Sequence, residues 1–87
     1  MSDTTERMKN LLADYDHGCG YKRGDILRPR VGSGAGTFEV KDSMVVVLER
    51  NPLAPHQYLV LGERENPRSP SDRFIKFDVN GHDWEKV

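Results

Sequence analysis

The stretch MVVVL at residues 44–48, followed by QYLVL at residues 57–61, indicates the fold of this chain. Both stretches are rich in apolar and β-branched residues, which favour an extended backbone. Three further short segments complete the set: GDIL at 24–27, FIKFDV at 74–79 and DWEKV at 83–87. Turn residues close each segment, so the pattern predicts a small, mainly β fold, either a barrel or a sandwich.

The two central segments are apolar at consecutive positions rather than at alternate ones. Because successive side chains of a strand point to opposite faces, both faces of the predicted sheet carry apolar side chains. One face can fill the interior of a barrel. The other face needs a cover, which either the N-terminal helix or another protein chain can supply.

The N-terminal segment is predicted to be an amphipathic helix that provides this cover. Its apolar residues recur at helical spacing as one stripe: Met8, Leu11, Leu12 and Tyr15. Gly18 can end the helix in a left-handed conformation. A helix of about a dozen residues is only marginally stable alone in water, so we expect it to lie across the barrel. The expected organisation is a helix with a glycine-containing linker over residues 1–20, followed by a small β-barrel over residues 21–87.

The predicted strands are joined by connections of two kinds. Asn80-Gly81 is a strong signal for a tight type I′ hairpin, because both residues tolerate positive φ, and it predicts pairing of the segments on either side. Residues 29–43 form a longer excursion. Its glycine-rich tip at 32–36 is predicted to be flexible and to return as a short strand at 37–40.

This order of segments resembles the Src-homology-3-like (SH3-like) superfold, which includes the KOW and Tudor types. The resemblance is carried by Gly24-Asp25-Ile26-Leu27 as opening strand, a long first loop through Val40, three meandering strands and a closing strand, Asp83-Trp84-Glu85. It implies an SH3-like barrel of five to six antiparallel strands. The N-terminal α-helix is an addition to that pattern, so the expected fold is mainly β with one N-terminal α-helix. Such barrels bind proteins, peptides or nucleic acids, so the resemblance implies a binding module without choosing its ligand.

The composition fits one small globular domain. The chain has 87 residues, of which 31% are charged and 36% hydrophobic, which predicts a compact core under a charged surface. A formal net charge of −1 excludes a globally basic nucleic-acid binder but allows a local basic patch. The single cysteine, Cys19, cannot form an internal disulfide. Together with the lack of a membrane-length apolar run or an apolar signal core, this predicts a soluble, cytoplasmic protein that does not enter membranes.

Two patterns suggest a catalytic or cofactor-binding role, and neither is complete. The glycine-rich tip at 32–36 lacks the Gly-Lys-Ser/Thr of a phosphate-binding loop and precedes a predicted strand rather than a helix. Residue types that bind metals are scattered along the chain: His17, Cys19, His56, His82 and Asp83. They show no paired Cys-x-x-Cys or His-x-x-x-His spacing, and no third group orients a Cys–His nucleophile. The sequence therefore predicts no catalytic, cofactor-binding or metal-binding residue, and no enzyme.

A basic stretch follows the linker: Lys22, Arg23, Arg28 and Arg30. These side chains would suit a row of phosphates, with Tyr21 and Phe38 available to stack on bases. A KOW-like or Tudor-like nucleic-acid-binding protein is therefore one hypothesis. The same charges would also suit a rim that steers a protein partner.

The preferred hypothesis is a non-catalytic module that binds another protein. Its apolar surface exceeds the needs of one small barrel interior, and aromatic side chains dominate interface energetics. Tyr58, Phe74 and Trp84 are the candidate anchors, with Phe38 beside the basic rim, although a core position is the preferred interpretation of Trp84 and the first interpretation of Tyr58. A free-standing barrel without catalytic residues resembles the accessory proteins that bacteriophages encode to engage host machinery, as inhibitors or adaptors. A structural subunit of a larger assembly is a further alternative, and the sequence leaves open whether the chain is a monomer or a homodimer.

Overall fold

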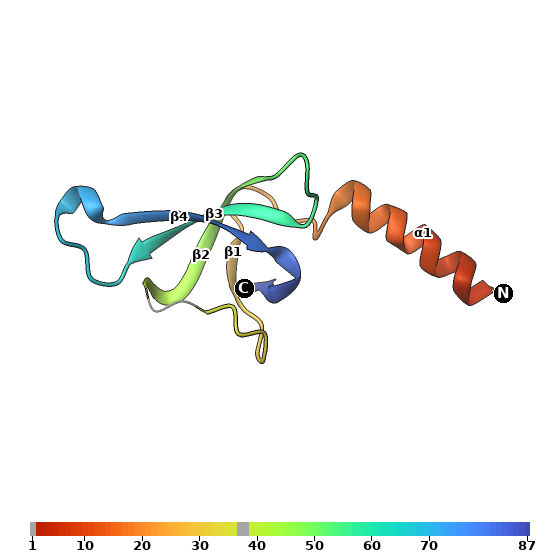
Figure 1. The fold of residues 1–87 in the computed structure, drawn as a ribbon, viewed down its shortest axis with the longest axis horizontal. Coiled ribbons are helices and arrows are strands. Elements are labelled where there is room, and N and C mark those ends of the chain that lie inside the picture. The colour runs from red at the N-terminus through yellow and green to blue at the C-terminus, as the bar shows by residue number, and fades with distance from the viewer. Residues whose placement is uncertain (1, 37–38) are drawn as a thin grey trace.

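The computed structural model describes residues 2–36 and 39–87, without the side chains of Ser2, Asp14 and His17. Within these ranges the chain forms one α-helix, five β-strands and two short 3₁₀-helices (Figure 1). The helix is α1 (Ser2–His17), and the strands are β1 (Ile26–Pro29), β2 (Val40–Arg50), β3 (Gln57–Arg64), β4 (Phe74–Asn80) and β5 (Trp84–Lys86). The 3₁₀-helices η1 (Pro70–Asp72) and η2 (Gly81–Asp83) precede β4 and β5. The predicted mainly β fold with one N-terminal helix is confirmed.

All five strands belong to one antiparallel sheet in the order β4-β3-β2-β1-β5. β2 joins the two halves of the sheet, because it pairs with β3 and also with β1 through Val45 and Val46. β5 returns to β1 and places Trp84 opposite Pro29. β4 and β5 are therefore the outer strands, and in the described part of the chain no pairing between them closes the sheet.

β2 is irregular near its start. Its register with β3 shifts between Val40 and Val45, and Asp42 and Ser43 in this interval have positive φ of 59° and 54°. Irregularities of this kind bend a strand and increase its twist, which allows β2 to serve both halves of the sheet. Of the short strand predicted to lead into β2, Val40 begins β2, and residues 37–38 lie outside the described ranges.

The hairpin predicted at Asn80-Gly81 is wrong. Asn80 has extended backbone (φ −85°, ψ 117°), and its side-chain oxygen accepts a hydrogen bond from the N–H of His82. This contact begins η2, which carries the chain across to β1 instead of back along β4. At this position the capping ability of asparagine outweighs its tolerance of positive φ.

The hydrophobic core is built from one face of the sheet, and every strand contributes to it. Its buried residues are Leu27, Val40, Val45, Val47, Tyr58, Val60, Val79 and Trp84. Val45 and Val47 are 2% and 1% exposed, whereas Val46 between them is only half-buried, as strand alternation requires. Full burial of one such side chain stabilises the fold by about 1.5–3 kcal/mol.

α1 does not lie across the sheet, so this expectation from the sequence was wrong. Figure 1 shows it extending away from the strands, and the molecule measures 58 Å by 27 Å by 18 Å. Its apolar side chains are all exposed: Met8 51%, Leu11 60%, Leu12 62% and Tyr15 64%. These four residues are called the α1 stripe below. Across residues 2–36 and 39–87, no helix combines the length and apolar character needed to cross a bilayer.

Candidate functional site

The linker after α1 is held against the loop between β2 and β3. Gly18 has a φ of +61°, and a side chain at this position would collide with the carbonyl of Pro55, so glycine is required on both grounds. Nη1 of Arg50 donates a hydrogen bond of 3.1 Å to the carbonyl of Asp16, near the end of α1. These contacts set the point at which α1 leaves the sheet. They explain why α1 extends outward although its stripe is apolar.

Cys19 lies in this linker and packs against the core. Its N–H donates a hydrogen bond of 3.1 Å to the hydroxyl of Tyr58, which is fully buried. Gly81 faces the thiol, and a Cβ at that position would lie 2.7 Å from Cys19 Sγ. The position of the thiol is therefore set by a main-chain hydrogen bond on one side and by a close approach to Gly81 on the other.

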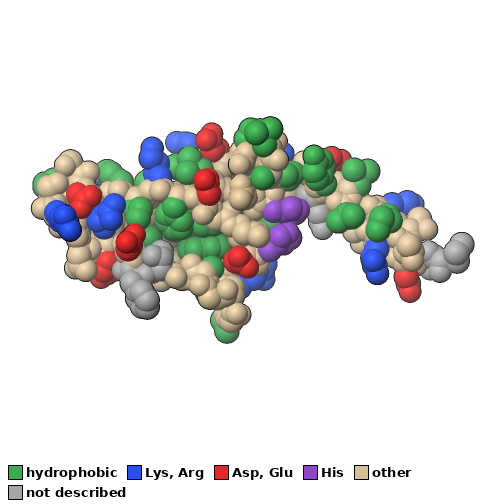
Figure 2. Space-filling view, in the orientation of Figure 1, with side chains coloured by type: hydrophobic (Ala, Val, Ile, Leu, Met, Phe, Trp, Pro, Cys, Tyr) green, Lys and Arg blue, Asp and Glu red, His purple; other side chains and the backbone are tan. Residues whose placement is uncertain are grey.

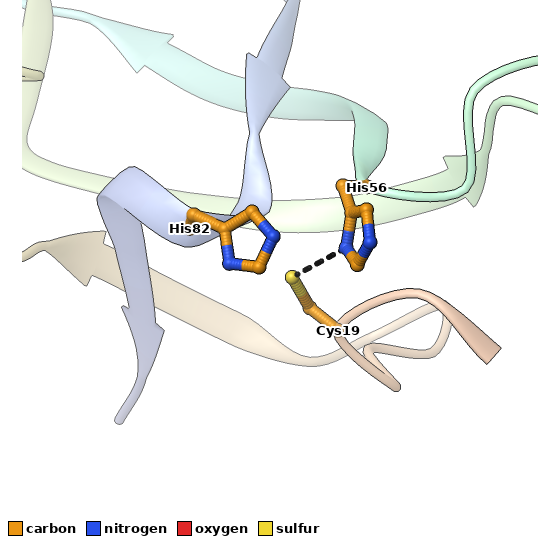
Figure 3. A group of neighbouring side chains, drawn as sticks. All are labelled: Cys19, His56 and His82. Carbon is orange, nitrogen blue, oxygen red and sulfur yellow. Dashed lines mark hydrogen bonds between the residues drawn. The ribbon is translucent and has the colours of Figure 1, made fainter. Parts of the chain in front are cut away.

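Cys19, His56 and His82 come together at one end of the sheet and form what we call the Cys–His cluster (Figure 3). Cys19 Sγ lies 3.5 Å from His56 Nδ1. The rings of His56 and His82 have centroids 4.3 Å apart and an interplanar angle of 36°. One donor atom from each of the three residues lies within 4.8 Å of the other two. Figure 2 shows the histidine side chains at the junction between the sheet and α1.

The pairing of β3 with β4 brings the two histidines together. Gln57 pairs with Asn80 at the end of the ladder, so the residues just beyond this pair meet at the same end of the sheet. The N–H of Gly81 donates a hydrogen bond of 2.7 Å to the carbonyl of His56. The side chain of Asn80 accepts a hydrogen bond of 3.0 Å from the N–H of His82. The backbone on both sides of the cluster is therefore fixed.

The sequence predicts no metal site from the members of the Cys–His cluster, because they show no paired ligand spacing. Cys19 and His56 are 37 residues apart, so no local spacing reveals them. The usable signal is strand register, because His56 directly precedes β3 and His82 closely follows β4. Chemically, the cluster combines one thiol with two imidazoles, which are donors that bind borderline-soft divalent metals.

Tyr21 links this region to the closing strand. Its hydroxyl donates to the carbonyls of Gly81 and Trp84 at 3.2 and 2.9 Å, and its ring packs against Tyr58 with centroids 5.2 Å apart. Burial, reinforced by the nearby Cys19, raises the pKa of Tyr21 above its usual value. Because the ring is packed and the hydroxyl is engaged, Tyr21 is poorly placed for the base stacking predicted from the sequence.

The predicted basic stretch is exposed in full: Lys22, Arg23, Arg28 and Arg30. Its three arginines nevertheless interact within the chain. Arg23 donates to a main-chain carbonyl of β2 at 3.2 Å, Arg28 lies 3.7 Å from Glu85, and Arg30 lies close enough to the Tyr21 hydroxyl to lower its pKa against the larger effect of burial. Exposed pairs of this kind contribute at most about 1 kcal/mol to stability. Only the pairing of Arg28 with Glu85 offsets a positive charge of the stretch, whereas the contact of Arg23 occupies a donor that a phosphate would use.

The predicted aromatic anchors do not form one surface. Tyr58 and Trp84 are 0% and 2% exposed and belong to the core, as their preferred interpretation had it, and this corrects the alternative in which they are exposed anchors. Their burial follows from strand alternation, since each occupies an inward position of its strand. Phe74 is 58% exposed on β4, and the Arg73 guanidinium lies 5.3 Å from its ring centre. Phe38 lies outside the described residues.

The loop between β3 and β4 lies at the end of the molecule remote from α1 (Figure 1), and residues of this loop line a polar depression. Its lining residues are Glu39, Arg64, Glu65, Asn66, Arg68, Ser69 and Asp72. Arg64 Nε lies 3.3 Å from the Asp72 carboxylate, which also accepts a hydrogen bond from the N–H of Arg68. Ligand pockets are usually lined mainly by apolar side chains, and this depression is not.

Comparisons with protein-family models, with curated proteins and with solved structures gave no match for this chain. Two features of the molecule itself therefore bear on its function. One is the exposed α1 stripe, and the other is the Cys–His cluster at the base of α1.

Proposed function

We propose that this protein is a non-catalytic binding module that engages another protein through the α1 stripe. The observation that carries the proposal is the exposure of all four stripe side chains, between 51% and 64%, on a helix that projects from the sheet. Figure 2 shows hydrophobic side chains gathered along this helix. Contiguous apolar surface of this kind marks interaction sites in proteins. An amphipathic helix that presents such a stripe fits an apolar groove on its partner.

A partner with a groove suits the α1 stripe better than a second copy of the same helix. From Met8 to Tyr15 the stripe spans about 11 Å at a rise of 1.5 Å per residue. Two stripes of this length placed side by side bury far less than the roughly 1,200 Å² of a stable interface. A groove encloses the helix on more than one side and adds the flanks of α1 to the buried area. We therefore assign the stripe to a partner protein that carries an apolar, helix-accepting groove.

We also propose that the sheet is an SH3-like barrel that serves as the scaffold for α1. The return of β5 to β1 supports this proposal, because it makes the closing strand a neighbour of the opening strand. The bend in β2 supports it as well, since bulged strands let a small sheet curve around its core. A phage-encoded inhibitor or adaptor would use such a scaffold to present a short helix to a host protein.

Capture experiments with stripe variants test the proposed binding. The immobilised protein is incubated with bacterial lysate, beside a Leu11→Glu/Leu12→Glu variant and an Asn10→Glu control. Asn10 is exposed on the opposite side of α1, and each of these substitutions introduces glutamate, a good helix former. We expect one captured protein that is lost with the double variant and retained with Asn10→Glu.

Competition completes the capture test. An excess of a peptide spanning residues 2–17 should displace the captured protein, because the peptide carries the whole stripe. Capture that survives both the double substitution and the peptide would show that the partner contacts another surface. Self-association that depends on Leu11 and Leu12 would instead assign the stripe to a homodimer and overturn the choice of partner.

A further inference from the structure

The Cys–His cluster brings three side chains of metal-binding type together from three separate segments. Cys19 is held by the linker, His56 by the loop before β3, and His82 by η2. We propose that these three side chains bind one zinc-class divalent metal ion. The fourth coordination position would be left to water or to an incoming ligand.

The donor set selects the class of metal. A thiolate with two imidazoles matches the mixed sulfur and nitrogen sites that zinc occupies in proteins. Magnesium and calcium prefer carboxylate and carbonyl oxygens, and among the described residues the grouped donors here are one sulfur and two imidazoles. The set therefore favours Zn²⁺ and its spectroscopic substitute Co²⁺ over the hard cations.

The spacing of the donors is compatible with a tetrahedral site. Zn–S bonds of about 2.3 Å and Zn–N bonds of about 2.0–2.1 Å place sulfur and nitrogen about 3.5 Å apart, and two nitrogens about 3.3 Å apart. The Cys19 Sγ to His56 Nδ1 distance is 3.5 Å. No pair of donors in the group exceeds 4.8 Å. Since His82 is exposed, rotation of its side chain can supply the remaining approach.

Hydrogen bonds hold the backbone around the cluster in place before any metal binds. Tyr58 fixes the N–H of Cys19, and the N–H of Gly81 fixes the carbonyl of His56. Asn80 fixes the N–H of His82. Contacts of this type orient the residues that carry metal ligands and so lower the ordering cost of binding. Metal binding displaces the thiol proton of Cys19, which passes to solvent.

Cobalt titration tests the site directly. The chelator-treated protein, kept reduced with a phosphine, is titrated with Co²⁺ and then with Zn²⁺. We expect one Co²⁺ per chain, with a thiolate-to-cobalt charge-transfer band and intense tetrahedral d–d bands. Zn²⁺ should displace it and raise the melting temperature, because it binds the folded chain in preference to the unfolded one.

Ligand variants complete the test. Cys19→Ser should abolish the charge-transfer band, and His82→Ala should weaken binding by on the order of 100-fold or more, beyond typical second-shell effects. Because His82 is exposed, His82→Ala should remain folded even if Cys19→Ser does not. Asp83 is next to His82 but is not one of the grouped donors, so the Asp83→Asn variant should bind Co²⁺ as the original chain does. Substoichiometric binding, or equal binding by His82→Ala and the original chain, would overturn the proposal.

Discussion

Replacing Leu12 on α1 and Leu27 in the core with alanine should have very different effects on stability. Leu27 is 0% exposed, so Leu27→Ala should lower the free energy of unfolding by about 2–5 kcal/mol. Leu12 is 62% exposed and forms no part of the core. Its truncation removes little buried area, and alanine is the best helix former, so Leu12→Ala should change stability by less than about 0.5 kcal/mol.

Urea unfolding can measure both values through one reporter. Trp84 is the only tryptophan in the sequence and is 2% exposed, so its fluorescence follows the opening of the core. Unfolding midpoints combined with the slope of the transition give the two free energies. If Leu12→Ala lowered stability by more than about 1.5 kcal/mol, α1 would have to be packed on the sheet, and its exposure would be refuted.

Three further substitutions or titrations test individual parts of the structure. Gly81→Ala places a Cβ 2.7 Å from Cys19 Sγ and should destabilise the fold by about 1–3 kcal/mol in urea unfolding, whereas Gly36→Ala, with its nearest contact at 3.7 Å, should cost less than about 0.5 kcal/mol. Equal effects would contradict the close packing of Gly81. Burial raises the pKa of Tyr21 in the folded state. The stability that its protonated hydroxyl contributes is therefore complete below the usual tyrosine pKa and is lost as the pH rises through the raised pKa of the folded state. Stability should therefore fall above about pH 10 in the original chain and fall less in Tyr21→Phe; parallel pH profiles would contradict this. Mixed oligonucleotides should show no change in fluorescence anisotropy with protein on the order of tens of micromolar at low salt, and tight binding that Arg28→Glu and Arg30→Glu abolish would restore the nucleic-acid hypothesis.

The strands could be predicted from the sequence because their signal is local. MVVVL lies inside β2 and QYLVL inside β3, and their apolar, β-branched residues favour extended backbone in almost any context. Trp84 fits a core position because it is the one apolar residue of a short, otherwise charged strand and occupies its inward position.

Two predictions failed because they depended on how elements meet in space. Asn80-Gly81 fits a hairpin turn, but the bond from the His82 N–H to the Asn80 side chain starts η2 and sends the chain to β1. The stripe of α1 suggests docking on the sheet. Its direction is decided elsewhere, by the positive φ of Gly18 and the contact of that residue with Pro55.

The Cys–His cluster could not be predicted from spacing, because its members are brought together by register. The pairing of Gln57 with Asn80 places His56 and His82 at one end of the sheet, and the linker adds Cys19. A sequence pattern reports neighbours along the chain, whereas this site is made of residues that are neighbours only across the sheet.

Photo-crosslinking from α1 tests whether the stripe contacts a partner protein. A photoreactive amino acid is placed at Leu12 in one sample and at Asn10, on the opposite side of the helix, in another, and both are irradiated in bacterial lysate. We predict a crosslink from position 12 to a different protein and little or none from position 10. Crosslinks from position 12 to β2 or β3 of the same chain, or equal yields from both positions, would contradict the proposed role of the α1 stripe.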